Sequence, residues 1–219
     1  MSAFPNSPKL IKAGLVLVDA DTAQVRSVIS LQYNSDSLTR TLQVQTTGGS
    51  SNDRIEPVRF KGPAVETFKL EADIDATDQL ELADQNPVVV QCGIQPQLAT
   101  LEALVQPTAA QLAAVDREAS SGTLEIAPML APLVLFVWSK FRIVPVKVTD
   151  FSITEEAFDP SLNPIRAKVS LSLRVLSTDD LGFSSKAGSL FMAYLQTKEQ
   201  LARTVPSASL ARLGIGGIG

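Results

Sequence analysis

The sequence predicts a mainly β domain of the α+β class, with antiparallel strands and flanking helices. Apolar and polar residues alternate strictly over residues 165–175 and again over 64–75. Such alternation is typical of strands with one buried face and one wet face. Loops, and not regular helical crossovers, separate most of the strand-like segments, which favours an antiparallel sheet. With 219 residues, the chain is long enough to bury a sizeable core.

The first third of the chain predicts a hairpin, a loop and a long strand. Residues 9–18 and 24–34 are β-rich, and a turn-forming segment separates them, so we expect an opening hairpin. The polar, Gly/Ser-containing stretch at about 46–56 has no periodicity and is expected to be an exposed loop. The strand predicted at 64–75 should direct four side chains into the core: Phe68, Leu70, Ala72 and Ile74.

Helical spacing of apolar residues appears in two later regions. In an insertion at about 95–120 we expect two short helices, separated at Pro107 and with Thr108 as a candidate cap for the second. A longer helix is predicted over 186–204, with Pro206 ending it. We therefore divide the chain into a domain at 1–180, which includes the loop and the insertion, and a C-terminal helix with a Gly-rich tail at 181–219, interpreted as a docking arm.

The segment from Pro132 to Val175 is predicted to contain two strand-like runs around a loop. Trp138 lies in the first run and is expected to be a core residue, because aromatic residues in apolar strands usually are. The second run alternates, and its polar face carries Arg166, Lys168 and Arg174. This polar face is either solvated or lines a subunit contact or a channel.

Composition excludes several classes of function. The net charge of −4 gives no general cationic field, so we expect no nucleic-acid partner. The chain has no histidine, which excludes Ser-His-Asp, Cys-His and histidine-based zinc sites. Glu155 and Glu156 are adjacent and would face opposite sides of a strand, so they do not form a paired acid and base. The carboxylates at Asp73, Asp75, Asp78 and Glu81 lack the glycine and spacing of a calcium loop. No catalytic residue, metal site or cofactor is predicted.

Cysteine usage and hydropathy bear on location. Cys92 is the one cysteine, so no intrachain disulfide is possible, and a reducing compartment is expected. We find neither a signal peptide nor an apolar segment of about twenty residues, the length that a bilayer span requires. We therefore expect synthesis and assembly in the cytoplasm and no direct membrane insertion.

Three segments, in this order, resemble the tube-domain family of contractile injection systems, which are phage-tail-like machines: Leu31–Gln45 (LQYNSDSLTRTLQVQ), Glu56–Asp75 (EPVRFKGPAVETFKLEADID) and Trp138–Val175. Within that family the chain is most similar to the baseplate hub component, although it lacks an evident LysM module. The resemblance implies a fold of two packed antiparallel sheets with flanking helices and a hexameric ring around a lumen. The implied partners are further copies of the chain, a spike protein, inner-tube proteins and baseplate wedge proteins.

The resemblance also implies an interface. Residues 151–160 and 163–167 would form an inter-subunit or ring-to-ring hairpin. The predicted interface residues are Phe151, Glu155, Phe158, Asn163, Arg166, Lys168 and Arg174. The leading hypothesis is a non-enzymatic adaptor that joins the spike to the inner tube, starts tube assembly and becomes part of the particle's baseplate. The alternatives are an inner-tube subunit of the same machine and, from another class, a carboxylate-dependent hydrolase that uses Glu155 or Glu156.

Overall fold

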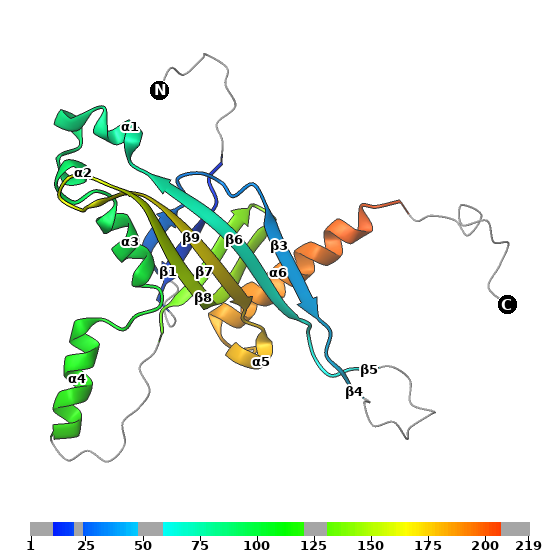
Figure 1. Cartoon of the computed structure of the whole chain (residues 1–219). Helices are drawn as coiled ribbons and strands as arrows, with labels where there is room; N and C mark the ends of the chain where they lie inside the picture. Colours follow the sequence, from blue (N-terminus) through cyan, green and yellow to red (C-terminus); the bar gives the residue numbers. More distant parts are fainter. Residues whose placement is uncertain (1–10, 20–23, 48–58, 121–130, 207–219) are drawn as a thin grey trace.

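The structure is a computed structural model that describes residues 11–19, 24–47, 59–120 and 131–206 (Figure 1). The turn of the opening hairpin, nearly all of the loop expected at 46–56, and the Gly-rich tail lie outside the described residues.

Seven antiparallel strands form one sheet in the order β2-β1-β7-β8-β9-β6-β3. Their bounds are β1 Gly14–Val18, β2 Val25–Ser30, β3 Leu38–Gln43, β6 Val65–Asp75, β7 Leu133–Ser139, β8 Arg142–Phe158 and β9 Pro164–Val175. Two further short strands, β4 Thr46–Thr47 and β5 Arg59–Phe60, pair with each other beside the sheet. The mainly β class, the pairing of the opening strands and the strand at 64–75 are confirmed.

The segment from Pro132 to Val175 differs from the expected two runs around a loop, because it forms three strands. A tight turn at Lys140 and Phe141 joins β7 to β8. β8 then runs for 17 residues, about 55 Å at the usual rise of a strand. Its first part pairs with β7 and its second part with β9, and the pairing with β9 shifts register between Val148 and Asp150. Such irregularities let a strand bend while it stays in the sheet.

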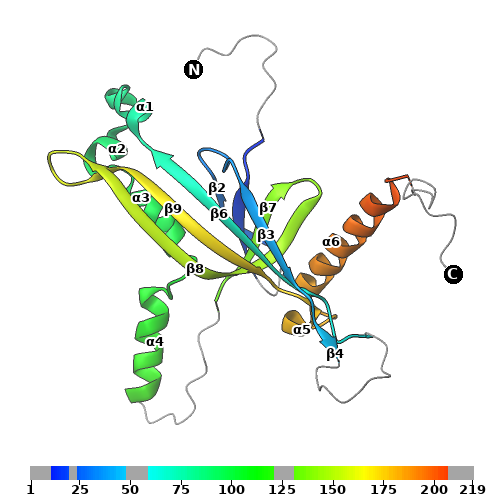
Figure 2. The ribbon, with the colours of Figure 1, turned by 45° about the vertical axis from the view of Figure 1, so that its right-hand side comes forward.

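The two packed layers implied by the resemblance are two halves of this one sheet. Phe68 on β6 and Phe136 on β7 have ring centroids 5.3 Å apart. Strands β8 and β9 separate β6 from β7 in the sheet order, so in a flat sheet their backbones would lie about 14 Å apart. The sheet therefore folds over along β8 and β9, and the half containing β7 packs on the half containing β6 (Figure 2).

Helices follow β6 and β9. Their bounds are α1 Thr77–Leu80, α2 Pro87–Cys92, α3 Gln95–Glu102, α4 Ala109–Ser120, α5 Thr178–Leu181 and α6 Lys186–Arg203, with a 3-10 turn η1 at Ala83–Gln85. The two helices expected at 95–120 and the helix expected at 186–204 are confirmed. Thr108 does cap α4: its hydroxyl accepts a hydrogen bond from the backbone N–H of Gln111 at 3.2 Å, and its own N–H donates to the Gln111 side chain at 2.9 Å.

The helices differ in how they meet the core. α3 contributes Leu98 and Leu101, and α6 contributes Phe191 and Tyr194. Trp138 is half-buried against the same core, and its ring centroid lies 5.9 Å from that of Phe136. By contrast, α4 has no buried residue and stands clear of the sheet in both views (Figures 1 and 2). The spacing that predicted α4 as a helix therefore did not predict a buried face.

We expect Phe68→Ala to destabilise the fold strongly, because Phe68 is fully buried where the two halves of the sheet meet. Loss of a buried phenyl ring typically lowers the free energy of unfolding by about 3–5 kcal/mol. Chemical denaturation followed by tryptophan fluorescence measures the change. Phe60→Ala is the matched control, since Phe60 is 77% exposed, and it should have little effect. Equal effects of the two substitutions would contradict this account of the core.

Candidate assembly surface

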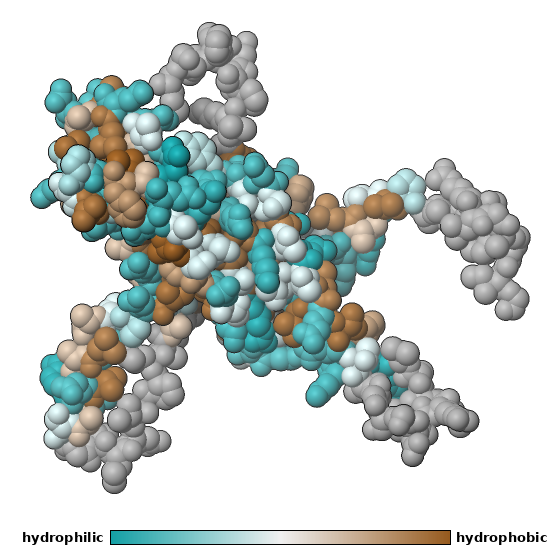
Figure 3. Space-filling view, viewed as in Figure 1, coloured by the Kyte–Doolittle hydropathy of each residue, from teal (hydrophilic) through white to brown (hydrophobic). Residues whose placement is uncertain are grey.

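The sheet has a core face and an outer face, and pairing assigns residues to each. Paired residues in an antiparallel sheet point to the same side. Over β8, β9, β6 and β3 the outer face is mostly polar, and we call it the polar outer surface. Its charged members are Lys69, Glu71, Asp73, Asp75, Lys147, Asp150, Glu156, Arg166, Lys168 and Arg174. Figure 3 looks onto this surface and shows mostly hydrophilic and neutral colours over these strands.

Ion pairs cross the strands of the polar outer surface. The Arg166 guanidinium contacts the Asp75 carboxylate at 2.8 Å, and the Lys168 ammonium lies 3.3 Å from Glu156. Hydrogen bonds from the side chain and backbone of Thr77, followed by the interaction with Arg166, lower the pKa of Asp75. Opposite charges therefore alternate on this surface and are partly neutralised within the subunit.

The hairpin of β8 and β9 ends in a closely bonded turn. Asp159 accepts hydrogen bonds from the backbone N–H groups of Ser161 at 2.7 Å and Asn163 at 2.8 Å. The Asn163 side chain also donates to Asp159. The hydrogen bonds from Asn163, and then the one from Ser161, lower the pKa of the Asp159 carboxyl. Leu162 has φ of +64°, a left-handed conformation that costs a leucine about 1–2 kcal/mol. The turn thus holds an apolar side chain, 77% exposed, in a strained position.

The base of this turn is joined to the helical segment after β6. Asn163 donates to the carbonyl of Gln91 at 3.2 Å, and the Ile94 N–H donates to the carbonyl of Pro164 at 2.8 Å. Gly93 fits between them at φ of +59°, and a Cβ there would lie only 2.1 Å from the Pro164 oxygen. Glycine is required at this position because no side chain fits.

The structure places the seven predicted interface residues in two groups. Three have roles within the subunit: Phe151 packs half-buried against the core, Asn163 holds the turn, and Arg174 binds Asp180 at 3.0 Å. The other four are exposed: Glu155, Phe158, Arg166 and Lys168. Their place in an interface stays a prediction. The prediction omitted Leu162, whose exposure follows from its position in the turn.

Glu155 and Glu156 do not come together. Glu155 pairs with Ala167, on the core side of β9, whereas Glu156 lies against Lys168 on the outer side. Within the described ranges, no group of three or more acidic, cysteine or histidine side chains is arranged to hold a metal ion. Over the same ranges, no helix is long and apolar enough to cross a membrane.

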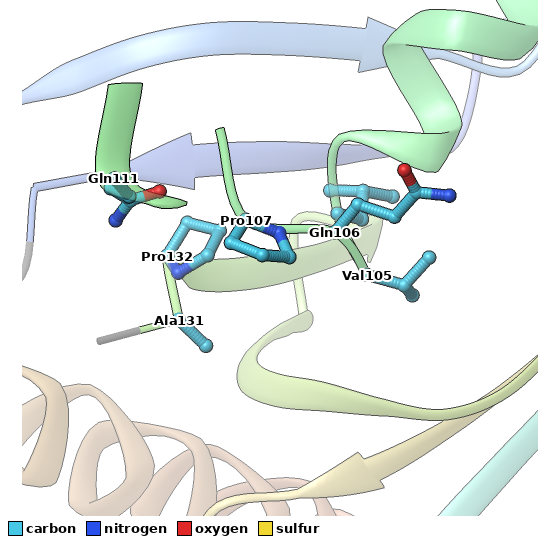
Figure 4. Close-up of a pocket in the computed structure, with 7 residues that line it drawn as sticks. Val105, Gln106, Pro107, Gln111, Ala131 and Pro132 are labelled. Atoms are coloured by element: carbon cyan, nitrogen blue, oxygen red, sulfur yellow. The ribbon is translucent and has the colours of Figure 1, made fainter. Parts of the chain in front are cut away.

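A surface cavity of about 250 Å³ lies at the base of α4 (Figure 4). Its lining contains no ionisable side chain: Leu104, Val105, Gln106, Pro107, Gln111, Ala131 and Pro132. The cavity therefore provides neither an acid nor a base. It lies where the segment after α3, the first turn of α4 and the residues before β7 meet.

A buried polar cluster fastens α6 to the sheet. Glu66 is only 3% exposed and accepts hydrogen bonds from the Tyr194 hydroxyl at 2.9 Å and the Lys198 ammonium at 3.0 Å, while Arg40 lies 3.5 Å away. Burial, and then the Glu66 charge, raise the pKa of Tyr194 to about 12. Sequence analysis missed this cluster, although Glu66 occupies a core-facing position in the alternation that continues at Phe68.

We expect Tyr194→Phe to lower the free energy of unfolding by roughly 1.5–3 kcal/mol, the usual contribution of a hydrogen bond to a charged group. Because the pKa of Tyr194 rises on folding from 10.0 to about 12, its stabilisation is present below pH 10 and is lost between pH 10 and 12. The difference between wild type and variant should shrink across that window in denaturation experiments. Tyr33→Phe is the control, since Tyr33 is 49% exposed and its substitution should change the free energy of unfolding little. A difference independent of pH would contradict the assignment.

Arg166→Glu should leave the chain folded and impair assembly if Arg166 lies in the predicted interface. The new carboxylate would lie opposite Asp75, at an exposed position where such pairs contribute about 1 kcal/mol or less. Thermal denaturation and particle imaging measure the two effects. Lys69→Glu is a matched control with the same charge change on the same surface. If Arg166→Glu assembles as wild type does, Arg166 loses its assigned place in the interface.

Comparisons with known proteins show a likeness to solved structures and none to family models or curated proteins. No protein-family model matches the sequence, and no curated protein matches it. Among solved structures, the chain is similar to a component of the tail of an empty GTA particle with C6 symmetry, at 11% sequence identity and a TM-score of 0.31. That match covers 75% of this chain and 90% of the other.

Proposed function

We propose that this chain is a non-enzymatic structural subunit of a phage-tail-like particle, which forms a hexameric ring, joins the spike to the inner tube and initiates the tube. The observation that carries the proposal is the polar outer surface. Strands β8, β9, β6 and β3 expose a mostly polar face on one side and bury the core on the other. A sheet face that remains wet along its length suits the wall of a lumen.

The charges on that surface support the same role. Acidic and basic residues alternate across neighbouring strands, as where Asp73 pairs with Lys168 and Asp75 with Arg166. A wall of mixed sign attracts neither cations nor anions strongly, because the fields of neighbouring charges cancel within about a Debye length, near 10 Å. Such a wall lets another molecule pass without binding it.

The ends of the sheet support ring formation. In the described part of the chain, β2 and β3 each have a hydrogen-bonded neighbour on one side only. Both edges carry exposed apolar residues: Val25 and Val28 on β2, and Leu42 and Val44 at β3. Unpaired edges invite pairing with another chain. Because the two edges differ, pairing one with the other is head-to-tail, and such pairing closes into a ring when the rotation allows.

The adaptor role within such a particle rests on the sequence resemblance to hub components. An inner-tube subunit would share the ring and the lumen but would be present in many copies per particle. Copy number therefore separates these two functions.

Native mass spectrometry and particle imaging of the full chain, alone and with the spike and tube proteins of its own particle, test the proposal. We expect a six-membered ring that caps the spike and occurs once per particle. Many stacked rings per particle would replace the adaptor with the tube subunit. A monomer that binds neither partner would overturn the proposal.

Leu162→Gly should separate stability from assembly. Glycine adopts positive φ without strain, so we expect the isolated subunit to be unchanged or more stable by up to about 1 kcal/mol. If the tip of the hairpin contacts the next ring, the loss of an exposed leucine should weaken stacking. Thermal denaturation and particle length distributions measure both. The control is Leu82→Gly, which removes another exposed leucine. Normal stacking of the Leu162→Gly variant would exclude the tip from the contact.

A further inference from the structure

The outer face changes character along β8. On the half formed by β2, β1 and β7, with the start of β8, the outward residues are apolar. Cross-strand pairs place Val28 beside Val16, Val16 beside Leu135, and Val137 beside Ile143. We call Val16, Val25, Val28, Leu135, Val137 and Ile143 the apolar outer surface. Beyond Pro145, β8 continues with Lys147 and the polar outer surface begins.

The subunit covers one end of the apolar outer surface and leaves the other end exposed. Leu181 of α5 and Ala187 of α6 pack near Val18 and Leu133, and Val16 and Leu135 are partly buried against the same cluster. Away from them, Val28 is 64% exposed, Val25 is 61% exposed and Ile143 is 41% exposed. Val25 and Val28 lie on β2 and Ile143 lies on β8, and the half-buried Val137 of β7 shares their face next to Ile143, which distinguishes them from isolated surface hydrophobics.

Helix α4 also has apolar residues that the chain leaves uncovered. It has twelve residues, none of them buried, and Leu112 on it is 50% exposed. Isolated helices of this length are marginal in water, so most of their stability comes from packing of an apolar face. Leu112 and Val115 are three residues apart and lie on the same side of α4. Among the described residues, α4 therefore packs on no surface, and the end of the sheet face that carries Val28 and Ile143 stays exposed.

We propose that α4 of one copy of the chain packs on the apolar outer surface of a second copy. Leu112 and Val115 would lie on Val28, Val137 and Ile143, on strands of one face that span about 14 Å from β2 to β8, against a helix about 18 Å long. Charge is complementary at the border: Asp116 follows Val115 on α4, and Lys140 is exposed at the turn between β7 and β8. β2 also supplies a free edge of the sheet, so a neighbour that pairs there lies beside this surface.

This contact goes beyond the proposed function, because it assigns a specific helix exchange between neighbours and holds for an adaptor or a tube subunit. It also gives the apolar outer surface a role different from that of the polar outer surface. The polar outer surface faces water, and the apolar outer surface faces the neighbouring copy.

Disulfide trapping between two single-cysteine variants tests the contact. In a Cys92→Ser background of the full chain, Val115→Cys is mixed with Val28→Cys under mild oxidation. Docking raises the local concentration of the two thiols, so we expect a covalent heterodimer at least about tenfold faster than with the control pair. The control replaces Val115→Cys with Arg117→Cys, which faces the other side of α4. Equal rates for the two pairs would overturn the proposal.

The double variant that carries Val115→Cys and Val28→Cys in one chain distinguishes exchange from self-docking. A ladder of covalent oligomers supports exchange between copies. An internally bridged monomer alone would show that α4 folds back on its own sheet and would overturn the proposal. A sixfold ring that gives no trapping also overturns it and leaves the proposed function standing, because that ring would then close through other contacts.

A second measurement avoids cysteine. Leu112→Asp should lower the fraction of assembled protein in native mass spectra and leave thermal stability of the subunit unchanged, because α4 buries no residue. Ala110→Asp, on the opposite side of α4, is the control and should assemble as wild type does. Equal assembly of both variants would contradict the contact.

Discussion

The contact of Phe68 with Phe136 is the constraint on which the rest of the structure depends. It joins two strands that the sheet order separates, so the sheet has to fold over. That fold requires a strand long enough to serve both halves, and β8 meets the requirement with 17 residues and register shifts. Once the halves meet, a single core forms between them, and the faces on the far side necessarily point outward. The outer surfaces are consequences of this core.

The two outer surfaces divide along β8, and one pattern of residues on the strand explains both. Ile143 and Pro145 share the outer face with Lys147 and Asp150, and the change from apolar to charged comes within a few residues. Burial of apolar area contributes about 25 cal/mol for each Å² removed from water, so the apolar part favours covering. The charged part favours remaining wet, because burial of these ion pairs would cost more than it returns. The chain therefore has one outer surface that favours being covered and one that favours contact with water.

Much of the fold could be predicted from sequence, because alternation depends only on local spacing. It assigned Phe68, Leu70, Ala72 and Ile74 to the core correctly, and proline and threonine marked the start of α4. Strand partners depend on contacts distant in sequence, so the folding of one sheet and the extent of β8 were not foreseen. Arg174 could not be separated from Arg166 by pattern alone, since its partner Asp180 lies in the short helix α5 that was not expected. Glu66 is a charged residue at a core-facing position of β6, where the alternation otherwise places apolar residues. This departure is visible in the sequence and could have indicated the buried cluster.

The continuity of β8 has a mechanical consequence. The strand runs unbroken from the half that contains β7 to the tip of the hairpin, and the tip is tied to the helical segment through Asn163 and Pro164. Hydrogen bonds in a sheet lie across the strands, so a load along β8 is carried by covalent backbone and shared in shear by the bonds to β7 and β9. The register shifts near Val148 and Glu155, where the ladder between β8 and β9 is irregular, are then the places at which such a load would bend the strand first.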